Sequence, residues 1–380
     1  MMKKLSTNIN GYIEGYYGRL LKWSERNLIL KKLNKCNFNT YFYCPKEDIE
    51  HRLEWRKNYK TKWLTSLKKF CFSAKQNKIK VLAGISPGLN FNFITNHPDY
   101  EILIKKAKIL KKTGVNQICL MFDDIEPLSP SILNDRKTEG TLHAELANFL
   151  SNQLGETIFV VPRIYADELF ESENTYLKDF CKNLNHNIPI FYCGKKIVSD
   201  TNNKEELSSL LKYSSNRIIF WDNLYANDYC PMRVFLGPYL GRSHFNNTMI
   251  NPTGMVETDL FLLDLIYSSI SNDNIEYGWI KNLEKYKIPY QYKIISEYFF
   301  PINYKQNRKV KNYKFEDEVK ALDFLLWKWK NSLSREWYQY LLILKNSLQI
   351  ANGNLEISRF EKIFPIPLKY TLLKLNLEDK

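Results

Sequence analysis

The chain of 380 residues has no uninterrupted apolar stretch of about 18 residues, the length that a membrane-spanning helix requires. Its N-terminus also lacks the apolar core of a signal peptide, because polar residues follow the two lysines at positions 3 and 4. We therefore expect a cytoplasmic protein that has no membrane among its partners.

Paired cysteines and clustered histidines are missing too. The seven cysteines form no Cys-x-x-Cys pair, and the five histidines are scattered, without the spacing that places two ligands on one face of a helix. We expect reduced, mostly buried thiols, no disulfide framework and no metal site.

Long runs of like charge are absent, although the formal net charge is +14. Such an excess raises nucleic acid or a membrane surface as a partner, but the lysines are spread along the chain and no nucleic-acid-binding signature is present. We expect no nucleic-acid partner. Binding that weakens steeply with added salt would indicate the opposite.

Short β-rich runs alternate with longer amphipathic stretches, which is typical of parallel α/β folds. The candidate strands are residues 11–17, 38–43, 79–85, 116–122, 157–161, 188–192, 217–221 and 246–250. These strand-then-helix units favour a closed (β/α)8 TIM-type barrel over residues 1–300, and they make it the predicted catalytic domain. An open doubly wound sheet is the alternative on pattern alone.

Beyond residue 300 this alternation stops. Apolar and aromatic residues recur at spacings of three and four between residues 316 and 350, which predicts one long amphipathic helix or a pair of helices. We expect residues 301–380 to form a helical C-terminal region whose Trp and Tyr side chains pack against the barrel or a second subunit.

The carboxyl ends of the barrel strands are where the active site is expected, so the residues after each apolar run are the candidates. Carboxylates, amides, a lysine and aromatic or glycine surfaces occur there, in segments 14–19, 43–48, 86–90, 122–127, 221–229 and 251–252. These segments contain no thiol–histidine pair and no phosphate-binding glycine loop. This mixture suits a sugar ligand.

Asp123 and Asp124 are the most informative pair, because two carboxylates after an apolar run are costly to bury unless they face a cavity. Within one pocket, their repulsion would leave one ionised and the other protonated at neutral pH, which gives a general acid beside an anionic stabiliser. The alternative is a solvent-facing turn in which one of them caps the next helix.

Adjacent aspartates on one strand cannot easily flank a glycosidic bond from opposite sides, as the two carboxyl groups of most glycosidases do. They suit substrate-assisted hydrolysis, in which the 2-acetamido oxygen of the sugar attacks the anomeric carbon. The protein then needs one acid/base and one carboxylate that holds the amide N–H. The spacing therefore indicates an N-acetyl sugar.

Eight motifs occur in order between residues 9 and 300: GYIEGYYGR, NTYFYCPKED, HRLEWR, SPGLNF, MFDDIEP, WDNLYANDY, FLGPYLGR and NPTG. Together they resemble glycoside hydrolase family 84, the β-N-acetylglucosaminidases that include protein O-GlcNAcase. The resemblance implies a retaining exo-β-N-acetylglucosaminidase that hydrolyses terminal β-linked GlcNAc through an oxazoline intermediate, with no cofactor.

The resemblance also implies roles for individual residues. Asp123 would orient and polarise the acetamido group, and Asp124 would act as general acid and then as general base. The substrate-binding residues that it implies are Gly15 and Lys46 at the sugar hydroxyls, Tyr165 and Trp221 beside the acetamido group, and Asn223, Asp228 and Asn251 at the acetamido group or the outer hydroxyls.

The expected partner is a GlcNAc-bearing glycan or glycoprotein, and the resemblance leaves open whether the sugar is removed from Ser or Thr of proteins or from oligosaccharides. The resemblance also raises a homodimer through the helices after residue 316, as in some relatives. A catalytically silent barrel that binds GlcNAc or a glycoprotein is the alternative function, and the presence of both Asp123 and Asp124 argues against it.

Overall fold

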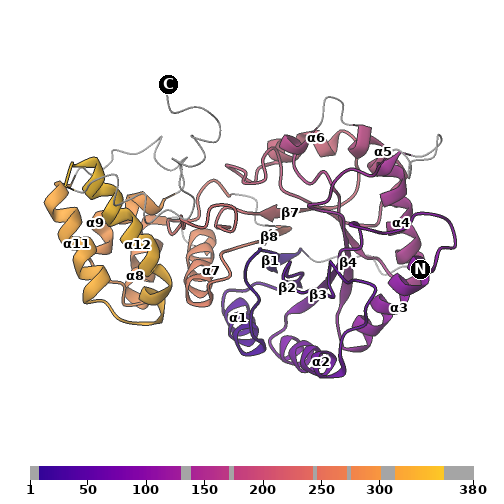
Figure 1. The fold of residues 1–380 in the computed structure, drawn as a ribbon, viewed down its shortest axis with the longest axis horizontal. Coiled ribbons are helices and arrows are strands. Elements are labelled where there is room, and N and C mark those ends of the chain that lie inside the picture. Colours follow the sequence, from indigo (N-terminus) through magenta and orange to yellow (C-terminus); the bar gives the residue numbers. More distant parts are fainter. Residues whose placement is uncertain are drawn as a thin grey trace, which may run out of the picture. The chain divides into compact units, whose positions relative to one another are not determined.

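The computed structural model describes residues 8–129, 138–170, 175–242, 246–271, 275–300 and 313–354. Eight parallel strands close into a barrel, in which the strands pair in chain order and the last pairs with the first (Figure 1). They are β1 (Asn10–Glu14), β2 (Thr40–Tyr43), β3 (Lys80–Ile85), β4 (Gln117–Met121), β5 (Phe159–Val161), β6 (Ile190–Tyr192), β7 (Ile218–Asp222) and β8 (Thr248–Ile250). This confirms the predicted (β/α)8 barrel and excludes the open sheet.

Apolar side chains from the strands fill the interior of the barrel. Ile13, Phe42, Met121, Phe191 and Met249 belong to this buried cluster, and none of them is more than 1% exposed. The interior is therefore a packed core and not a pore, as in other barrels of this kind. Polar residues consequently collect where the strands end.

Helices follow the strands and surround the barrel (Figure 1). The α-helices are α1 (Trp23–Lys35), α2 (Thr61–Gln76), α3 (Pro98–Lys112), α4 (Glu139–Leu154), α5 (Thr175–Asn183), α6 (Ser208–Leu211) and α7 (Val256–Ser271), and the short 3-10 helices are η1 (Asp167–Leu169) and η2 (Lys204–Leu207). Within the described ranges, no helix combines the length and the apolarity needed to cross a bilayer.

The chain divides into two compact units, residues 1–229 with 238–279 and residues 230–237 with 280–380. The division falls within α8 (Ile275–Lys285), so that α9 (Tyr292–Ile295) and the 3-10 helix η3 (Ser296–Phe299) belong to the second unit. The sequence pattern predicts its boundary at residue 300, where the alternation of strands and helices stops.

The second unit contains the predicted C-terminal helical segment as a pair of helices, α11 (Phe315–Trp327) and α12 (Ser332–Ala351). The side chain of Asn331 caps α12 by accepting a hydrogen bond from the Ser334 backbone N–H at 2.7 Å. Trp337 is fully buried, with its ring centroid 5.6 Å from that of Trp329 and 5.2 Å from that of Tyr292. The aromatic stripe of α12 therefore packs within its own unit.

Candidate active site

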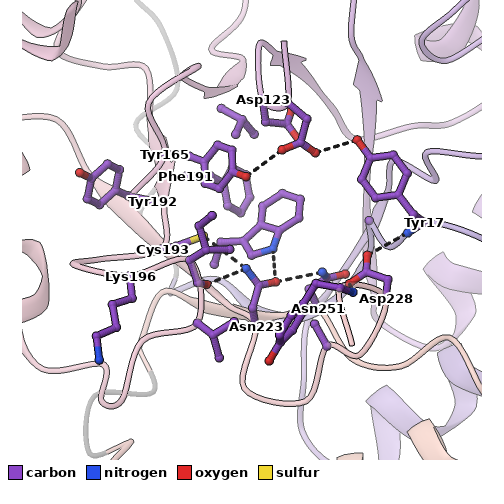
Figure 2. A pocket seen from close by; sticks show the side chains of 18 of the residues that line it. Tyr17, Asp123, Tyr165, Phe191, Tyr192, Cys193, Lys196, Asn223, Asp228 and Asn251 are labelled. Carbon is purple, nitrogen blue, oxygen red and sulfur yellow. Dashed lines mark hydrogen bonds between the residues drawn. The ribbon is translucent and has the colours of Figure 1, made fainter. Parts of the chain in front are cut away.

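The nine predicted site residues line a single pocket of about 620 Å³ in the first compact unit (Figure 2). They are Gly15, Lys46, Asp123, Asp124, Tyr165, Trp221, Asn223, Asp228 and Asn251. They come from β1, β2, β4, β5, β7 and β8 or from the residues just after these strands. The volume lies within the range of about 300–1,000 Å³ that small-molecule sites occupy.

Asp123 and Asp124 follow the end of β4, and the backbone at Asp124 is in the left-handed region, with φ of +54°. In an extended strand, successive side chains point to opposite faces, so this turn is what brings both carboxyl groups into one pocket. Neither residue caps α4, because Thr138 does so. The side chain of Asp123 is 7% exposed and that of Asp124 is 31% exposed, so Asp124 lies nearer to solvent.

Lys46 forms ion pairs with both aspartates. Its Nζ donates to Oδ2 of Asp123 and lies 3.3 Å from Oδ2 of Asp124. Burial by itself would lower the pKa of the Lys46 ammonium, but the two carboxylates outweigh burial and raise it, so the side chain is a cation.

The ionisation of Asp124 depends on more than the repulsion between the two aspartates. Repulsion within the pair was expected to leave one carboxyl group protonated at neutral pH. Burial does favour the protonated form of Asp124, but Lys46 and hydrogen bonds from Tyr165 and Tyr17 lower its pKa below the usual value. In the absence of substrate Asp124 is therefore a carboxylate.

Two tyrosines, both labelled in Figure 2, each hold one oxygen of the Asp124 carboxylate. The Tyr17 hydroxyl donates to Oδ2 at 2.8 Å, and the Tyr165 hydroxyl donates to Oδ1 at 2.7 Å. Burial raises the pKa of Tyr17 to about 12, with Lys46 opposing and Asp124 adding to the rise, so the hydroxyl keeps its proton. Sequence analysis gave Tyr17 no role, although it lies within the first motif.

Hydrogen bonds join Trp221, Asn223 and Asn251 in the pocket, and Figure 2 labels the two asparagines. Oδ1 of Asn223 accepts from Nε1 of Trp221 and from Nδ2 of Asn251, both at 2.9 Å. Its Nδ2 donates to the backbone carbonyl of Ile197 at 2.9 Å and to Sγ of Cys193 at 3.5 Å. In the described structure the amide of Asn223 therefore holds its neighbours in place, and a contact with substrate would replace one of these bonds.

Two acceptors in the pocket are buried without a hydrogen-bond partner among the described residues: Oδ1 of Asp123 and Oδ1 of Asn251. A buried acceptor without a donor is costly, so these atoms are positions where a ligand N–H or O–H would be stabilised. Both donor types occur on an N-acetylated sugar.

Asp228 and Gly15 shape the pocket near the end of β1. Oδ2 of Asp228 accepts from the Tyr17 backbone N–H at 2.9 Å, which ties the loop after β7 to the loop after β1. Gly15 lies against the Trp221 ring, where a side chain would not fit.

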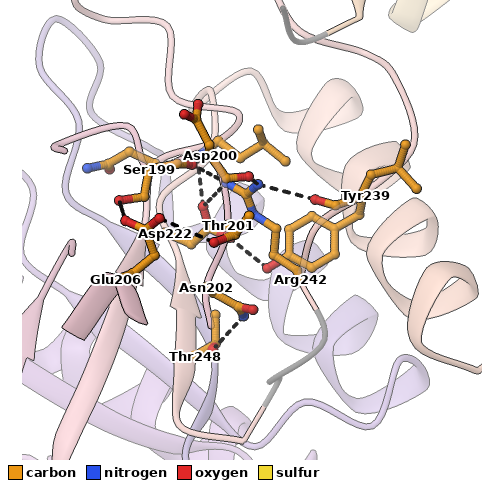
Figure 3. Close-up of polar contacts among 12 residues, drawn as sticks. Ser199, Asp200, Thr201, Asn202, Glu206, Asp222, Tyr239, Arg242 and Thr248 are labelled. Carbon is orange, nitrogen blue, oxygen red and sulfur yellow. Dashed lines mark hydrogen bonds and ion pairs between the residues drawn. The ribbon is translucent and has the colours of Figure 1, made fainter. Parts of the chain in front are cut away.

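Asp222 stands between Trp221 and Asn223 in the chain and forms a buried ion pair with Arg242 (Figure 3). Nε of Arg242 donates to Oδ2 of Asp222 at 3.2 Å. Nη2 of Arg242 donates to the Ser199 carbonyl at 2.6 Å, and Nη1 donates to the Asp200 carbonyl. Arg242 thereby ties the loop after β6, which contributes to the pocket wall, to the end of β7.

One side of the pocket, which comes largely from β5, β6 and the loops that follow them, was not predicted from the sequence. The further lining residues are Tyr17, Val161, Glu168, Phe191, Tyr192, Cys193, Lys196, Ile197, Val198, Ala226 and Tyr229. The strand-end rule would have found Cys193 and Lys196 had it been applied to the sixth predicted strand. No group of three or more His, Cys, Asp or Glu residues in the described ranges could hold a metal ion.

Comparisons with known proteins identify the family of the chain. The family model for β-N-acetylglucosaminidase matches residues 10–257. The protein O-GlcNAcases of Rattus norvegicus and Mus musculus are each 31% identical to the chain over 240 residues, which is 61% of this chain and 26% of theirs. The chain therefore spans about a quarter of the length of these relatives.

The solved structure of CpGH84B has the same fold. It matches with a TM-score of 0.75 and 21% sequence identity, covering 99% of this chain and 74% of that one. The family match extends over more than half of the chain and includes all nine predicted site residues. The chain thus belongs to the β-N-acetylglucosaminidases of glycoside hydrolase family 84.

Proposed function

We propose that the chain is a retaining exo-β-N-acetylglucosaminidase that hydrolyses terminal β-linked GlcNAc with assistance from the substrate's own acetamido group. The arrangement of Asp123 and Asp124 carries this proposal. The two are consecutive residues that face the same pocket and share Lys46, so they suit a reaction in which the nucleophile comes from the sugar.

Asp123 is the residue that holds the acetamido group. Its Oδ1 is a buried acceptor without a partner in the described structure, and it accepts the amide N–H of the substrate. This bond orients the acetamido oxygen toward the anomeric carbon and stabilises the positive charge that develops on the amide. As the oxygen attacks, the glycosidic bond breaks and an oxazoline-type intermediate forms.

Asp124 is the general acid and then the general base. It donates a proton to the departing glycosidic oxygen, and in the second step it accepts a proton from the water that opens the intermediate with net retention. Since its pKa is lowered in the free protein, Asp124 must gain a proton in the substrate complex. A sugar that excludes water and draws Lys46 to its hydroxyls raises that pKa, which allows the exchange.

The other pocket residues bind the sugar. Gly15 and Lys46 meet ring hydroxyls, Tyr165 and Trp221 enclose the acetamido group, and Asn223, Asp228 and Asn251 act at that group or at the outer hydroxyls. The partnerless Oδ1 of Asn251 supports a contact with a hydroxyl donor. No cofactor takes part, because the acid, the base and the nucleophile are all present in the protein and the substrate.

Ser- or Thr-linked GlcNAc of a cytoplasmic protein is the substrate class that we favour over oligosaccharides. The name of the rat and mouse relatives, protein O-GlcNAcase, supports this choice. A homodimer through the C-terminal helices stays a prediction, which sizing chromatography tests.

The test of the proposed function is hydrolysis of aryl N-acetyl-β-glucosaminides by the purified protein at neutral pH, with and without a chelator. We expect turnover that resists the chelator and releases the β-anomer first, as seen by NMR. Asp123→Asn should lose about 100-fold or more with every aryl group, whereas Asp124→Asn should lose least with the best leaving groups, which need little proton donation.

Asp317→Asn is the matched control, because Asp317 lies on the exposed surface of α11. It should behave as the unchanged protein does. Binding of GlcNAc without turnover would instead favour the catalytically silent barrel, and release of the α-anomer would contradict the retaining mechanism.

A further inference from the structure

Arg52 is a largely buried residue of the loop after β2, 8% exposed, to which neither the sequence nor the proposed reaction gives a role. Its Nη1 donates to the Tyr17 hydroxyl oxygen at 2.8 Å, and its Nη2 donates to the backbone carbonyl of Asp124. Arg52 is not one of the residues that line the pocket. Any effect that it has on the reaction is therefore indirect, and these hydrogen bonds lead to Tyr17 and Asp124.

The bond to Tyr17 determines where the hydroxyl proton points. A guanidinium can only donate, so the Tyr17 oxygen must accept from Arg52. The single proton of that hydroxyl is then directed to its other partner, Oδ2 of Asp124, at 2.8 Å. Without Arg52 the hydroxyl could rotate and accept from another donor, and the carboxylate would lose a bond that stabilises its ionised form.

The bond to the Asp124 carbonyl acts on the backbone. Asp124 has φ of +54°, a conformation that is unfavourable for residues with a side chain and that persists only when surrounding contacts maintain it. Nη2 of Arg52 contacts the carbonyl of this same residue. It therefore stabilises the turn that points the Asp124 carboxyl group into the pocket.

We propose that Arg52 is a positioning residue for the acid/base Asp124, which it holds in place through the Asp124 carbonyl and through the Tyr17 hydroxyl. This inference rests on the proposed function. The groups that face the Asp124 carboxyl are Lys46, Tyr17 and Tyr165, with Asp123 sharing Lys46. Arg52 is the residue that holds one of these groups and the Asp124 backbone together.

The competing explanation is that Arg52 only anchors the loop after β2. Arg56 in the same loop does this: Nε donates to Oδ1 of Asp99 at 2.7 Å, and Nη2 donates to the Asn90 carbonyl at 2.6 Å. Its guanidinium bonds go to Asp99 and Asn90, away from Tyr17 and Asp124, so Arg56→Met is the matched control for Arg52→Met. A loop anchor should change kcat/KM to the same extent for every leaving group.

The first measurement is kcat/KM over a series of aryl N-acetyl-β-glucosaminides whose leaving groups range from poor to good. Arg52→Met should lower kcat/KM by roughly 10- to 100-fold for the poorest leaving group and by less than about 3-fold for the best, because a misplaced acid matters most where proton donation is needed. Arg52→Lys keeps the charge but cannot reach both acceptors in the same geometry, so it should restore only part of the loss.

The second measurement is the pH profile of kcat, which reports ionisations of the substrate complex, in which Asp124 carries its proton. Loss of the Tyr17 bond to the carboxylate raises the pKa of Asp124, so the alkaline limb of Arg52→Met should move to higher pH. Tyr17→Phe should move it in the same direction. In the Tyr17→Phe background, Arg52→Met should shift the limb less than it does alone, because the two residues act in one chain of contacts.

The outcomes separate this inference from the proposed function. An unchanged protein that hydrolyses no aryl glucosaminide would overturn the proposed function itself. The inference alone would be overturned if the protein is active and Asp124→Asn behaves as expected, but Arg52→Met loses the same factor for all leaving groups and its alkaline limb does not move. If Arg52→Met does not fold, the pH profiles of Arg52→Lys and Tyr17→Phe are compared instead. A shift of the alkaline limb in the same direction in both variants supports the inference, and the absence of a shift in Arg52→Lys contradicts it.

Discussion

A Cβ atom on residue 15 would lie 2.8 Å from Cζ2 of Trp221, so the indole ring packs directly on the backbone of Gly15. That contact is closer than a methyl group permits. The ring is also held by the bond from its Nε1 to Asn223, so it cannot simply turn away. The glycine that follows β1 is thus part of what positions the aromatic wall of the pocket.

Gly15→Ala should displace Trp221 and raise KM for an aryl N-acetyl-β-glucosaminide by about 10-fold or more, since small misplacements within a site are costly. Steady-state kinetics and inhibition by free GlcNAc would measure the change. Gly155→Ala is the control, because a methyl group at residue 155 would meet no atom within 4 Å, although the backbone there has positive φ. It should cost about 1 kcal/mol of stability and leave KM unchanged. Equal KM values in both variants would contradict the role of the contact.

Lys46→Met should leave Asp123 and Asp124 facing each other without a shared cation. The two carboxylates would then repel each other out of their positions, and the sugar would lose the cation that meets its hydroxyls in the proposed complex. We expect kcat/KM to fall by at least about 100-fold. Lys57→Met is the matched control, because Lys57 is exposed and pairs only with Glu54 on the surface in the described structure. A loss of similar size in both variants would contradict the prediction.

Breaking the buried pair between Asp222 and Arg242 should destabilise the protein. Both side chains are at most 2% exposed, and removing one leaves the other as a buried charge, which typically costs about 3–5 kcal/mol. Urea unfolding of Arg242→Met would measure the loss. The exposed pair of Lys196 and Asp200 gives the comparison, and its removal by Asp200→Asn should cost less than about 1 kcal/mol. A small loss in Arg242→Met would show that the loop after β6 is held by other contacts.

His143 should make the fold less stable in mild acid. Burial, with a contribution from Arg163, lowers its pKa to about 3, whereas an unfolded histidine titrates near 6.5. Between these two values the unfolded chain binds a proton that the folded chain does not, so stability falls as the pH falls through that window.

At pH 5 the resulting loss relative to neutral pH is roughly 2 kcal/mol for this one residue. His143→Gln removes it, so the free energy of unfolding should change less between pH 7 and pH 5 than in the unchanged protein. Urea unfolding at both pH values is the measurement. The same change in both proteins would mean that His143 takes up its proton in the folded state.

Local sequence patterns predicted the barrel because they reflect the environment of each segment. All eight candidate strands overlap observed strands, since apolar runs of this length become buried on both faces when helices cover a parallel sheet. The strand-end rule then placed Lys46, Asp123 and Asn251 in one pocket, because the carboxyl ends of all strands in a closed barrel share one side.

The first strand shows what local sequence patterns cannot predict. The sequence predicted β1 to reach residue 17, but it stops at Glu14. The backbone of Tyr17 instead donates to Asp228 and its hydroxyl donates to Asp124, more than a hundred residues away in the chain. An aromatic run in the sequence cannot distinguish a side chain that continues a strand from one that leaves it to reach a distant partner.

Composition and periodicity by themselves therefore favoured the barrel, and they predicted the helical segment after it and most of the strand ends from which the pocket is built. Only the tertiary structure decided that Lys46 pairs with both aspartates, that the backbone turns at Asp124, and that Arg52 contacts the carbonyl of that turn. The physical reason is that a pKa and a side-chain direction depend on charges and donors within a few ångströms, and here those groups come from strand ends far apart in the chain.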